Sequence, residues 1–86
     1  MSMKMDETSK WLMGYISKKG DIPGQNAEEK MGADIFDGGL IDSFGVIEMI
    51  NDMESHFGIN FRPENMQDSR FRTINGISMI IMELKG

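Results

Sequence analysis

The spacing of apolar side chains predicts an amphipathic helix over residues 43–57. Counting from Val46, apolar residues recur at i+3, i+4, i+7 and i+11, which is one face of a helix with 3.6 residues per turn. Asp42 and Ser43 precede this repeat and are both good N-cap residues, and Gly58 is suited to end the helix in the left-handed conformation. We therefore expect a helix of about fifteen residues whose apolar face packs inward.

Similar patterns predict one helix near each end of the chain. The first runs from about Asp6 to Lys18, with acidic residues at its start and lysines at its end, as the helix dipole favours. Thr73 is a good N-cap for the last helix, which ends at about Lys85. The expected inner positions are Thr8, Leu12, Tyr15 and Ile16, with Trp11 at the edge, in the first helix and Ile74, Ile77, Ile81 and Leu84 in the last.

A long loop is predicted between the first helix and residue 43. Residues 20–31 contain Pro, Gly and Asn, which favour turns, although a helical turn within residues 27–31 is the alternative. Residues 32–42 continue the loop. A connection of this length is unusual in a small domain and is often functional. The side chains expected to anchor it to the helices are Ile35, Phe36, Leu40 and Ile41.

The segment after Gly58 has a different pattern. Apolar and polar residues alternate over residues 59–62, which predicts an extended strap that ends at Pro63. Residues 63–66 fit one helical turn, and residues 67–72 fit a loop or a short helix. Together these elements predict an all-α fold, a bundle of three long helices plus one short helix, with a long loop between the first two long helices.

Length and composition indicate one small domain over residues 1–86, with residues 1–4 frayed. The sequence contains no cysteine, so it has no disulfide framework, no thiol nucleophile and no thiolate metal site. It has no apolar run long enough to span a membrane and no signal-peptide pattern at its start. We therefore expect a cytoplasmic monomer, and any thiol that it uses must come from another molecule.

Negative charge is concentrated in the middle of the chain. Residues 21–58 contain nine acidic residues and one basic residue, a net charge of −8, whereas the whole chain has −5. This segment would repel nucleic acid and steer basic protein surfaces toward Ser43, although a solvated acidic face that aids solubility is the alternative. Trp11 and Tyr15 are accordingly interpreted as half-buried core residues and not as a platform for nucleobases.

No arrangement of residues predicts catalysis or a metal site. Ser43 and His56 are thirteen residues apart on one predicted helix, or about 20 Å, so they cannot form a Ser–His pair. A calcium loop that starts at Asp37 would have Gly39 and Ile41 at ligand positions, which excludes it. We predict no catalytic residue and no metal ligand, and therefore a protein that serves as a substrate of enzymes.

The stretch FDGGLIDSFGVIEMI around Ser43 resembles the prosthetic-group site of acyl carrier proteins. Its Gly-Leu-Ile-Asp-Ser loop is most similar to that of the free-standing D-alanyl carrier proteins, and the similarity extends from about residue 35 to residue 84. The resemblance implies an acyl-carrier-like bundle in which Ser43 receives 4'-phosphopantetheine from coenzyme A and Asp42 contributes to recognition. The first turn of a helix suits a phosphoester, because free N–H groups and the helix dipole favour negative charge there.

The outward face of the second long helix is predicted to contact partner enzymes. Its apolar side chains would give affinity and its carboxylates would orient basic residues of the partner. Phe44 replaces the leucine usual in the family, and Gly45 and Ser55 stand where acidic residues are frequent, which weakens a match to the standard fatty-acid partners. The docking residues expected are Phe44, Ile47, Glu48, Asn51, Asp52 and Glu54.

The resemblance further implies the function and the partners. The protein would present an acyl or aminoacyl group as a thioester on the phosphopantetheine arm. Its partners would be a phosphopantetheinyl transferase, an adenylating ligase or acyltransferase, and a downstream synthase or transferase. The cargo is left open among amino acids, fatty acids and polyketide units. The alternative function is an acidic helical interaction module that is never modified.

The ten methionines suggest a pliable interior. Met49, Met53, Met79 and Met82 are expected in or near the bundle. One hypothesis is that the bundle opens to hold an acyl chain, and the alternative is that these side chains fill gaps in the core.

Overall fold

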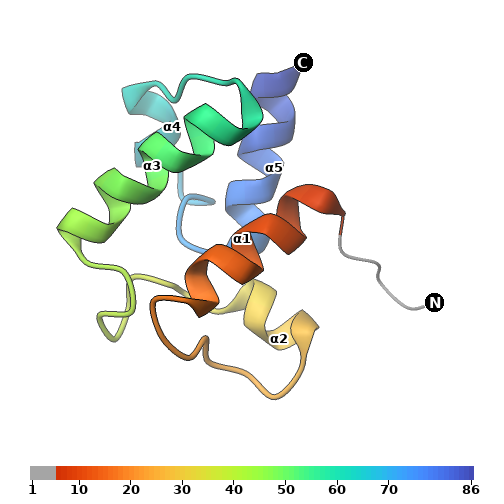
Figure 1. The fold of residues 1–86 in the computed structure, drawn as a ribbon, viewed down its shortest axis with the longest axis vertical. Coiled ribbons are helices and arrows are strands. Elements are labelled where there is room, and N and C mark those ends of the chain that lie inside the picture. Colours follow the sequence, from red (N-terminus) through yellow and green to blue (C-terminus); the bar gives the residue numbers. More distant parts are fainter. Residues whose placement is uncertain (1–5) are drawn as a thin grey trace.

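The computed structural model describes residues 6–86. They contain three long helices and two short ones, joined by loops and turns (Figure 1). The described residues contain no strand, so the predicted all-α class is confirmed. There are two short helices where the sequence predicted one. The five helices are α1 (Glu7–Ser17), α2 (Ala27–Gly32), α3 (Ser43–Phe57), α4 (Pro63–Gln67) and α5 (Ile74–Lys85).

The core consists mainly of aliphatic side chains from α1, α3, α5 and the loop before α3. Burying each of them contributes about 1.5–3 kcal/mol before the loss of conformational entropy is subtracted. The periodic positions predicted for the three long helices supply most of these residues. Those fully buried are Leu12, Ile16, Ile35, Met49, Met53, Ile74, Ile77, Ile80 and Ile81.

The ends of the long helices follow the sequence signals. The Asp6 carboxylate caps α1 by accepting a hydrogen bond from the Ser9 N–H at 2.8 Å, and Thr73 caps α5 in the same way. Gly58 follows α3 with φ of 68°, the left-handed conformation that glycine adopts without a steric penalty. These three boundaries agree with the prediction to within one residue.

Helix α2 corrects the loop that was the first prediction for residues 27–31 and confirms the alternative, a helical turn there. The Asn26 side chain accepts a hydrogen bond from the Glu29 N–H at 2.8 Å and starts the helix, and the side chain of Met31, within α2, is buried. Pro23 and Gly24 precede this cap, so they do not interrupt the helix. Helix α2 packs against α5 and lies at the end of the molecule away from the C-terminus (Figure 1).

The rest of the long loop is fastened to the segment before α5. Asp34 pairs with Thr73 in an isolated antiparallel bridge, and the Ile35 N–H donates to the Arg72 carbonyl at 2.8 Å. Ile35 and Ile41 are buried, while Phe36 and Leu40 are half-buried, so all four predicted anchors contribute. The entry into α3 is thereby held in a fixed place.

Asp34 is expected to make the stability depend on pH. A hydrogen bond from the Asp37 N–H, and next the Arg72 guanidinium, lower the pKa of its carboxyl. A lowered folded-state pKa stabilises the fold above about pH 4, the pKa of an unfolded aspartate, and this contribution is lost as the pH falls further. Urea unfolding should therefore show that Asp34→Asn loses less stability than the wild type between pH 7 and pH 3.

The control for this prediction is Asp21→Asn, because Asp21 is exposed and forms no ion pair within residues 6–86. It should lose as much stability on acidification as the wild type. Equal losses in all three proteins would contradict the role of Asp34.

A buried pair of hydroxyl groups joins α1 to α5. The Ser9 and Ser78 oxygens are 3.0 Å apart, and both side chains are buried. Ser78→Ala should lower the free energy of unfolding by about 1–2 kcal/mol, because it leaves the Ser9 hydroxyl without this partner. The double variant Ser9→Ala/Ser78→Ala should cost less than the sum of the two single variants in chemical denaturation. Additive costs would show that the two hydroxyls do not stabilise each other.

The segment between α3 and α5 is extended and then turns. Ile59 is buried, and the Phe61 ring meets Phe71 edge-on with 5.7 Å between centroids, so both apolar residues of the predicted strap face inward. Pro63 is the first residue of α4, where its missing N–H is not needed. Residues 68–72 form a bend and turns and not a helix.

The four methionines expected in or near the bundle divide into two pairs. Met49 and Met53 are fully buried in the core, as expected. Met79 and Met82 lie on the outer face of α5 and are 47% and 54% exposed, so they do not fill gaps between the helices. Within residues 6–86, no helix has the length and apolar character that crossing a membrane requires.

Candidate functional site

Ser43 is the first residue of α3, and its side chain is exposed. Asp42 is the N-cap: its Oδ1 accepts a hydrogen bond from the Gly45 N–H at 2.7 Å. Among the described residues, the Ser43 hydroxyl has no hydrogen-bond partner. The buried side chain of Ile41 holds the backbone just before the cap. This places an accessible hydroxyl at the positive end of the helix dipole.

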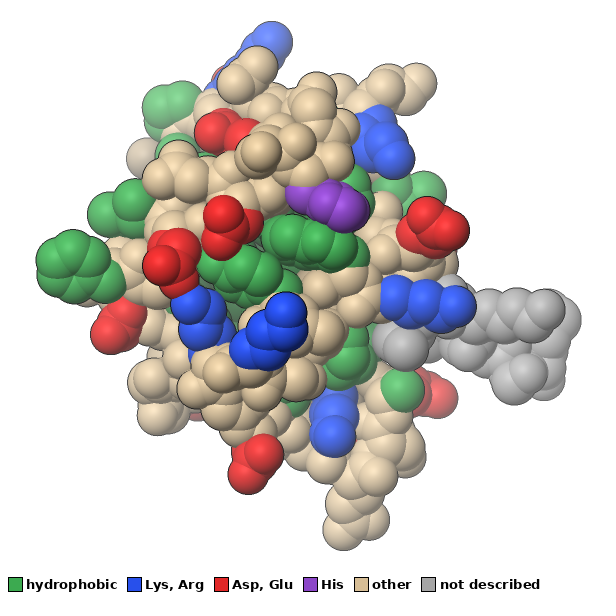
Figure 2. Space-filling view, in the orientation of Figure 1, with side chains coloured by type: hydrophobic (Ala, Val, Ile, Leu, Met, Phe, Trp, Pro, Cys, Tyr) green, Lys and Arg blue, Asp and Glu red, His purple; other side chains and the backbone are tan. Residues whose placement is uncertain are grey.

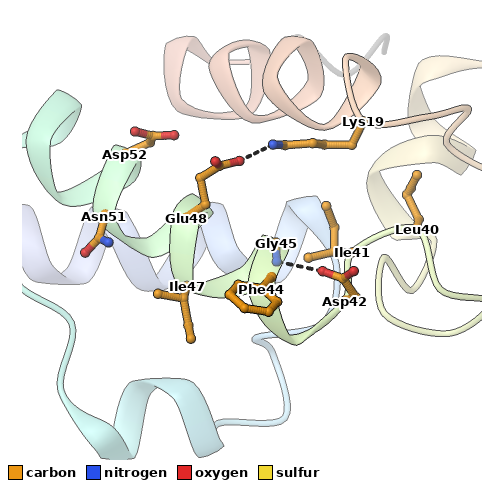
Figure 3. Close-up of a pocket in the computed structure, with 10 residues that line it drawn as sticks. All are labelled: Lys19, Leu40, Ile41, Asp42, Phe44, Gly45, Ile47, Glu48, Asn51 and Asp52. Carbon is orange, nitrogen blue, oxygen red and sulfur yellow. Dashed lines mark hydrogen bonds and ion pairs between the residues drawn. The ribbon is translucent and has the colours of Figure 1, made fainter.

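A groove of about 650 Å³ lies beside this helix start, between the end of the long loop, the end of α1 and the outer face of α3 (Figure 3). Both chain neighbours of Ser43 line it. The lining residues are Lys19, Leu40, Ile41, Asp42, Phe44, Gly45, Ile47, Glu48, Asn51 and Asp52.

Two apolar side chains of the groove are unusually exposed. Phe44 is 86% exposed and Ile47 is 59% exposed, although both are large and hydrophobic. Neither helps to form the core. Neighbouring exposed apolar side chains next to a hollow indicate a contact surface.

The acidic side chains of the groove have partners within the chain. Glu48 forms an ion pair with Lys19, which follows α1. The Tyr15 hydroxyl donates a hydrogen bond to Asp52 at 2.6 Å. Burial and then this bond raise the pKa of Tyr15 above its ordinary value. The carboxylates of α3 are therefore less available to a partner than the net charge of the segment suggests.

Five of the six residues predicted to contact partners line the groove, namely Phe44, Ile47, Glu48, Asn51 and Asp52. Glu54 does not line it, because its carboxylate turns to the strap and accepts a hydrogen bond from the Phe61 N–H at 2.8 Å. Nothing in the sequence indicated that Lys19 would line the groove or that Tyr15 would bond to Asp52 beside it. Only the crossing of α1 and α3 brings these side chains together.

A second hollow, of about 430 Å³, lies on another side of the first turns of α3. Ile47 lines both hollows. Apolar side chains dominate the second one, and Met66 of α4 is among them. The residues around it are Phe36, Val46, Ile47, Ile50, Met66, Gln67, Asp68, Ser69, Phe71 and Arg72.

His56 lies in the last turn of α3, at the end opposite to Ser43, so the two side chains do not meet. Its exposed ring stacks on Trp11 with 4.8 Å between centroids, and Trp11 also stacks on Tyr15 at 5.1 Å. On the face shown in Figure 2, hydrophobic side chains lie beside the histidine, and both acidic and basic side chains surround them. Residues 6–86 contain no cluster of His, Asp or Glu that could hold a metal ion.

Comparisons with known proteins relate the chain to one class of protein. The chain is 33% identical over 61 residues to the D-alanyl carrier protein of Streptococcus mutans, which covers 71% of this chain and 77% of the relative. The D-alanyl carrier protein of Streptococcus suis is 33% identical over 60 residues, covering 70% and 76%. D-alanyl carrier protein 1 of Lactiplantibacillus plantarum is 25% identical over 71 residues, covering 83% and 85%.

No protein-family model matches the chain, and no solved structure matches it significantly. The matches to the D-alanyl carrier proteins nevertheless extend over most of both sequences. They agree with the all-α architecture and with the resemblance carried by the loop before Ser43. The chain therefore belongs to the family of phosphopantetheine-type carrier proteins that includes the D-alanyl carrier proteins.

Proposed function

We propose that this protein carries an acyl or aminoacyl group as a thioester, and that Ser43 is the attachment point of 4'-phosphopantetheine. The observation that carries the proposal is the exposed Ser43 hydroxyl at the start of α3, beside the groove, in a member of a carrier family. Asp42 contributes to recognition by the transferase that attaches the group.

The residues around Ser43 fit such a group. The first N–H groups of α3 and the helix dipole favour the negative charge of a phosphodiester on the serine oxygen. Because the Asp42 carboxylate is held by the Gly45 N–H, it fixes the first turn without covering the serine. When bound, the group supplies the thiol that a chain without cysteine lacks.

The chain acts as a substrate in this proposal and not as an enzyme. Within residues 6–86, no histidine lies near Ser43 to activate its hydroxyl, because His56 is at the far end of α3, and the Asp42 carboxylate caps the helix instead. Partner enzymes therefore supply the chemistry of attachment, loading and transfer. They are a phosphopantetheinyl transferase, an adenylating ligase or acyltransferase, and a synthase or transferase that takes the cargo.

We further propose a D-alanyl group, or a similar small aminoacyl group, as the cargo. The names of the relatives point to D-alanine. Half of the ten groove residues also have charged or amide side chains, which suits a small polar aminoacyl group better than a fatty chain. The second hollow, which is mainly apolar, favours a hydrophobic acyl chain as the other candidate.

Intact mass spectrometry tests the carrier proposal. The purified protein is incubated with coenzyme A and a phosphopantetheinyl transferase of broad specificity. We expect a mass gain that corresponds to one phosphopantetheine group per chain. An unchanged mass, with a known carrier protein modified in parallel, would favour the unmodified interaction module instead.

The cargo is tested on the loaded protein. A ligase that activates D-alanine should charge it with D-alanine, and a fatty acyl ligase should charge it poorly. Acyl chains of increasing length are then attached enzymatically, and the methyl resonance of Met66, which lines the apolar hollow, is followed by NMR. Shifts of Met66 that grow with chain length would support an acyl cargo and count against the aminoacyl proposal.

A further inference from the structure

Lys19 reaches across the groove from the end of α1 to α3. Its ammonium group pairs with Glu48, and the two side chains are 32% and 59% exposed. Lys19 also lies over the Tyr15 ring, with 5.3 Å between the nitrogen and the ring centroid. Lys19 therefore partly neutralises the negative charge of Glu48 that a docking enzyme would meet at this turn of α3.

A second contact between α1 and α3 lies one helical turn from the Lys19–Glu48 pair. The Tyr15 hydroxyl bonds to Asp52, so residues four apart at the end of α1 engage residues four apart on α3. In Figure 3 Glu48 points toward Lys19, whereas Ile47 points to the opposite side of α3. The side chains of Phe44 and Ile47 therefore stay exposed, while the carboxylates of Glu48 and Asp52 are bound to Lys19 and Tyr15.

We propose that Lys19 is a specificity residue of the docking groove, an inference that rests on the proposed carrier function. It holds the Glu48 carboxylate that a lysine or arginine of a partner would otherwise contact. The groove consequently favours enzymes that bind mainly through the apolar side chains Phe44 and Ile47. Enzymes that depend on a basic residue at Glu48 must first displace Lys19, and they bind less well.

The size of the effect follows from the exposure of the ion pair. Exposed pairs of this kind are weak, so a partner can displace Lys19, and removing the lysine should change recognition by about two- to fivefold. Salt should suppress the difference, because the screening length falls from about 10 Å at 0.1 M salt to about 3 Å at 1 M, which weakens interactions between exposed charges.

The neighbouring Lys18 offers a matched control. It follows α1 directly and is exposed, but it does not line the groove. Lys18→Gln and Lys19→Gln therefore remove the same charge one residue apart, and only the second removes a groove contact. Thermal unfolding of both variants shows whether either change disturbs the fold.

The test measures kcat/KM for attachment of phosphopantetheine by a transferase of broad specificity, with coenzyme A, at low and high salt. We expect Lys19→Gln to be modified about two- to fivefold faster than Lys18→Gln at low salt and equally fast at high salt. In the Glu48→Gln background, replacing Lys19 should bring no gain, because the carboxylate that it releases is absent.

Two results would overturn the inference. One is equal rates for Lys19→Gln and Lys18→Gln at low salt, and the other is a gain from Lys19→Gln that persists in the Glu48→Gln background. Both leave the carrier function intact if the wild type is modified. If the wild type itself is not modified, the carrier proposal fails and the inference fails with it.

Discussion

Ser43→Ala should abolish the attachment of phosphopantetheine completely while leaving the fold intact. The Ser43 side chain is exposed, and the Asp42 cap that starts α3 does not involve it, so the loss of its hydroxyl should change stability by less than about 0.5 kcal/mol. Without the oxygen there is no atom at this helix start that can form the phosphoester. Intact mass after incubation with coenzyme A and transferase measures the loss.

The matched control is Ser55→Ala, because Ser55 is also exposed and also lies on α3, near its other end. This variant should gain one phosphopantetheine group at the rate of the wild type. A mass gain that survives Ser43→Ala, or that disappears in Ser55→Ala, would refute the proposed attachment point.

Gly76→Ala should lower the free energy of unfolding by several kcal/mol. A Cβ atom at residue 76 would lie 2.0 Å from the Arg70 carbonyl oxygen and 2.8 Å from its carbon, both of which belong to the backbone. Gly76 is the third residue of α5, so relieving the clash means moving the turn before α5 or the helix itself. Small domains are stable by about 5–15 kcal/mol, and a loss of roughly 3 kcal/mol or more would bring this one close to unfolding.

The control for Gly76 is Gly14→Ala on α1. A Cβ atom at residue 14 meets no atom within 4 Å, and the residue is exposed inside a helix. This substitution should raise stability by up to about 1 kcal/mol, because alanine favours a helix more than glycine does. Chemical denaturation of both variants distinguishes the two effects, and a Gly76→Ala protein as stable as the wild type would show that the turn does not approach α5 so closely.

The long helices were predictable because their signals are local. The apolar repeat from Val46, the Asp42 cap and the Gly58 C-cap each act within one or two turns, and all three agree with α3. Helix α2 was missed as the first choice, because the glycine and proline before Asn26 outweighed a six-residue helix whose one buried side chain is Met31. Short helices depend on such tertiary contacts more than on their own sequence.

In the candidate site, too, some features could be predicted from local sequence and others depend on how the helices pack. The start of the helix at Asp42 and Ser43 could be predicted from capping preferences, and Ser43 was singled out by the resemblance of its loop to that of acyl carrier proteins. The exposure of Phe44 and Ile47 follows from the helical period. The contacts of Lys19 with Glu48 and of Tyr15 with Asp52 could not be predicted, since these pairs are 29 and 37 residues apart. The close approach of Gly76 to the Arg70 carbonyl could not be predicted either, because the sequence does not indicate which backbone atoms come into contact.

Locating the modification by fragmentation mass spectrometry tests the central claim most directly. Trypsin cleaves after Lys30 and Arg70, and Pro63 protects the bond after Arg62, so Ser43, Ser55 and Ser69 are all in one peptide. After loading with coenzyme A and transferase, the fragment ions should place a single phosphopantetheine group on Ser43. A group on either of the other two serines, or an unmodified peptide, would contradict the account.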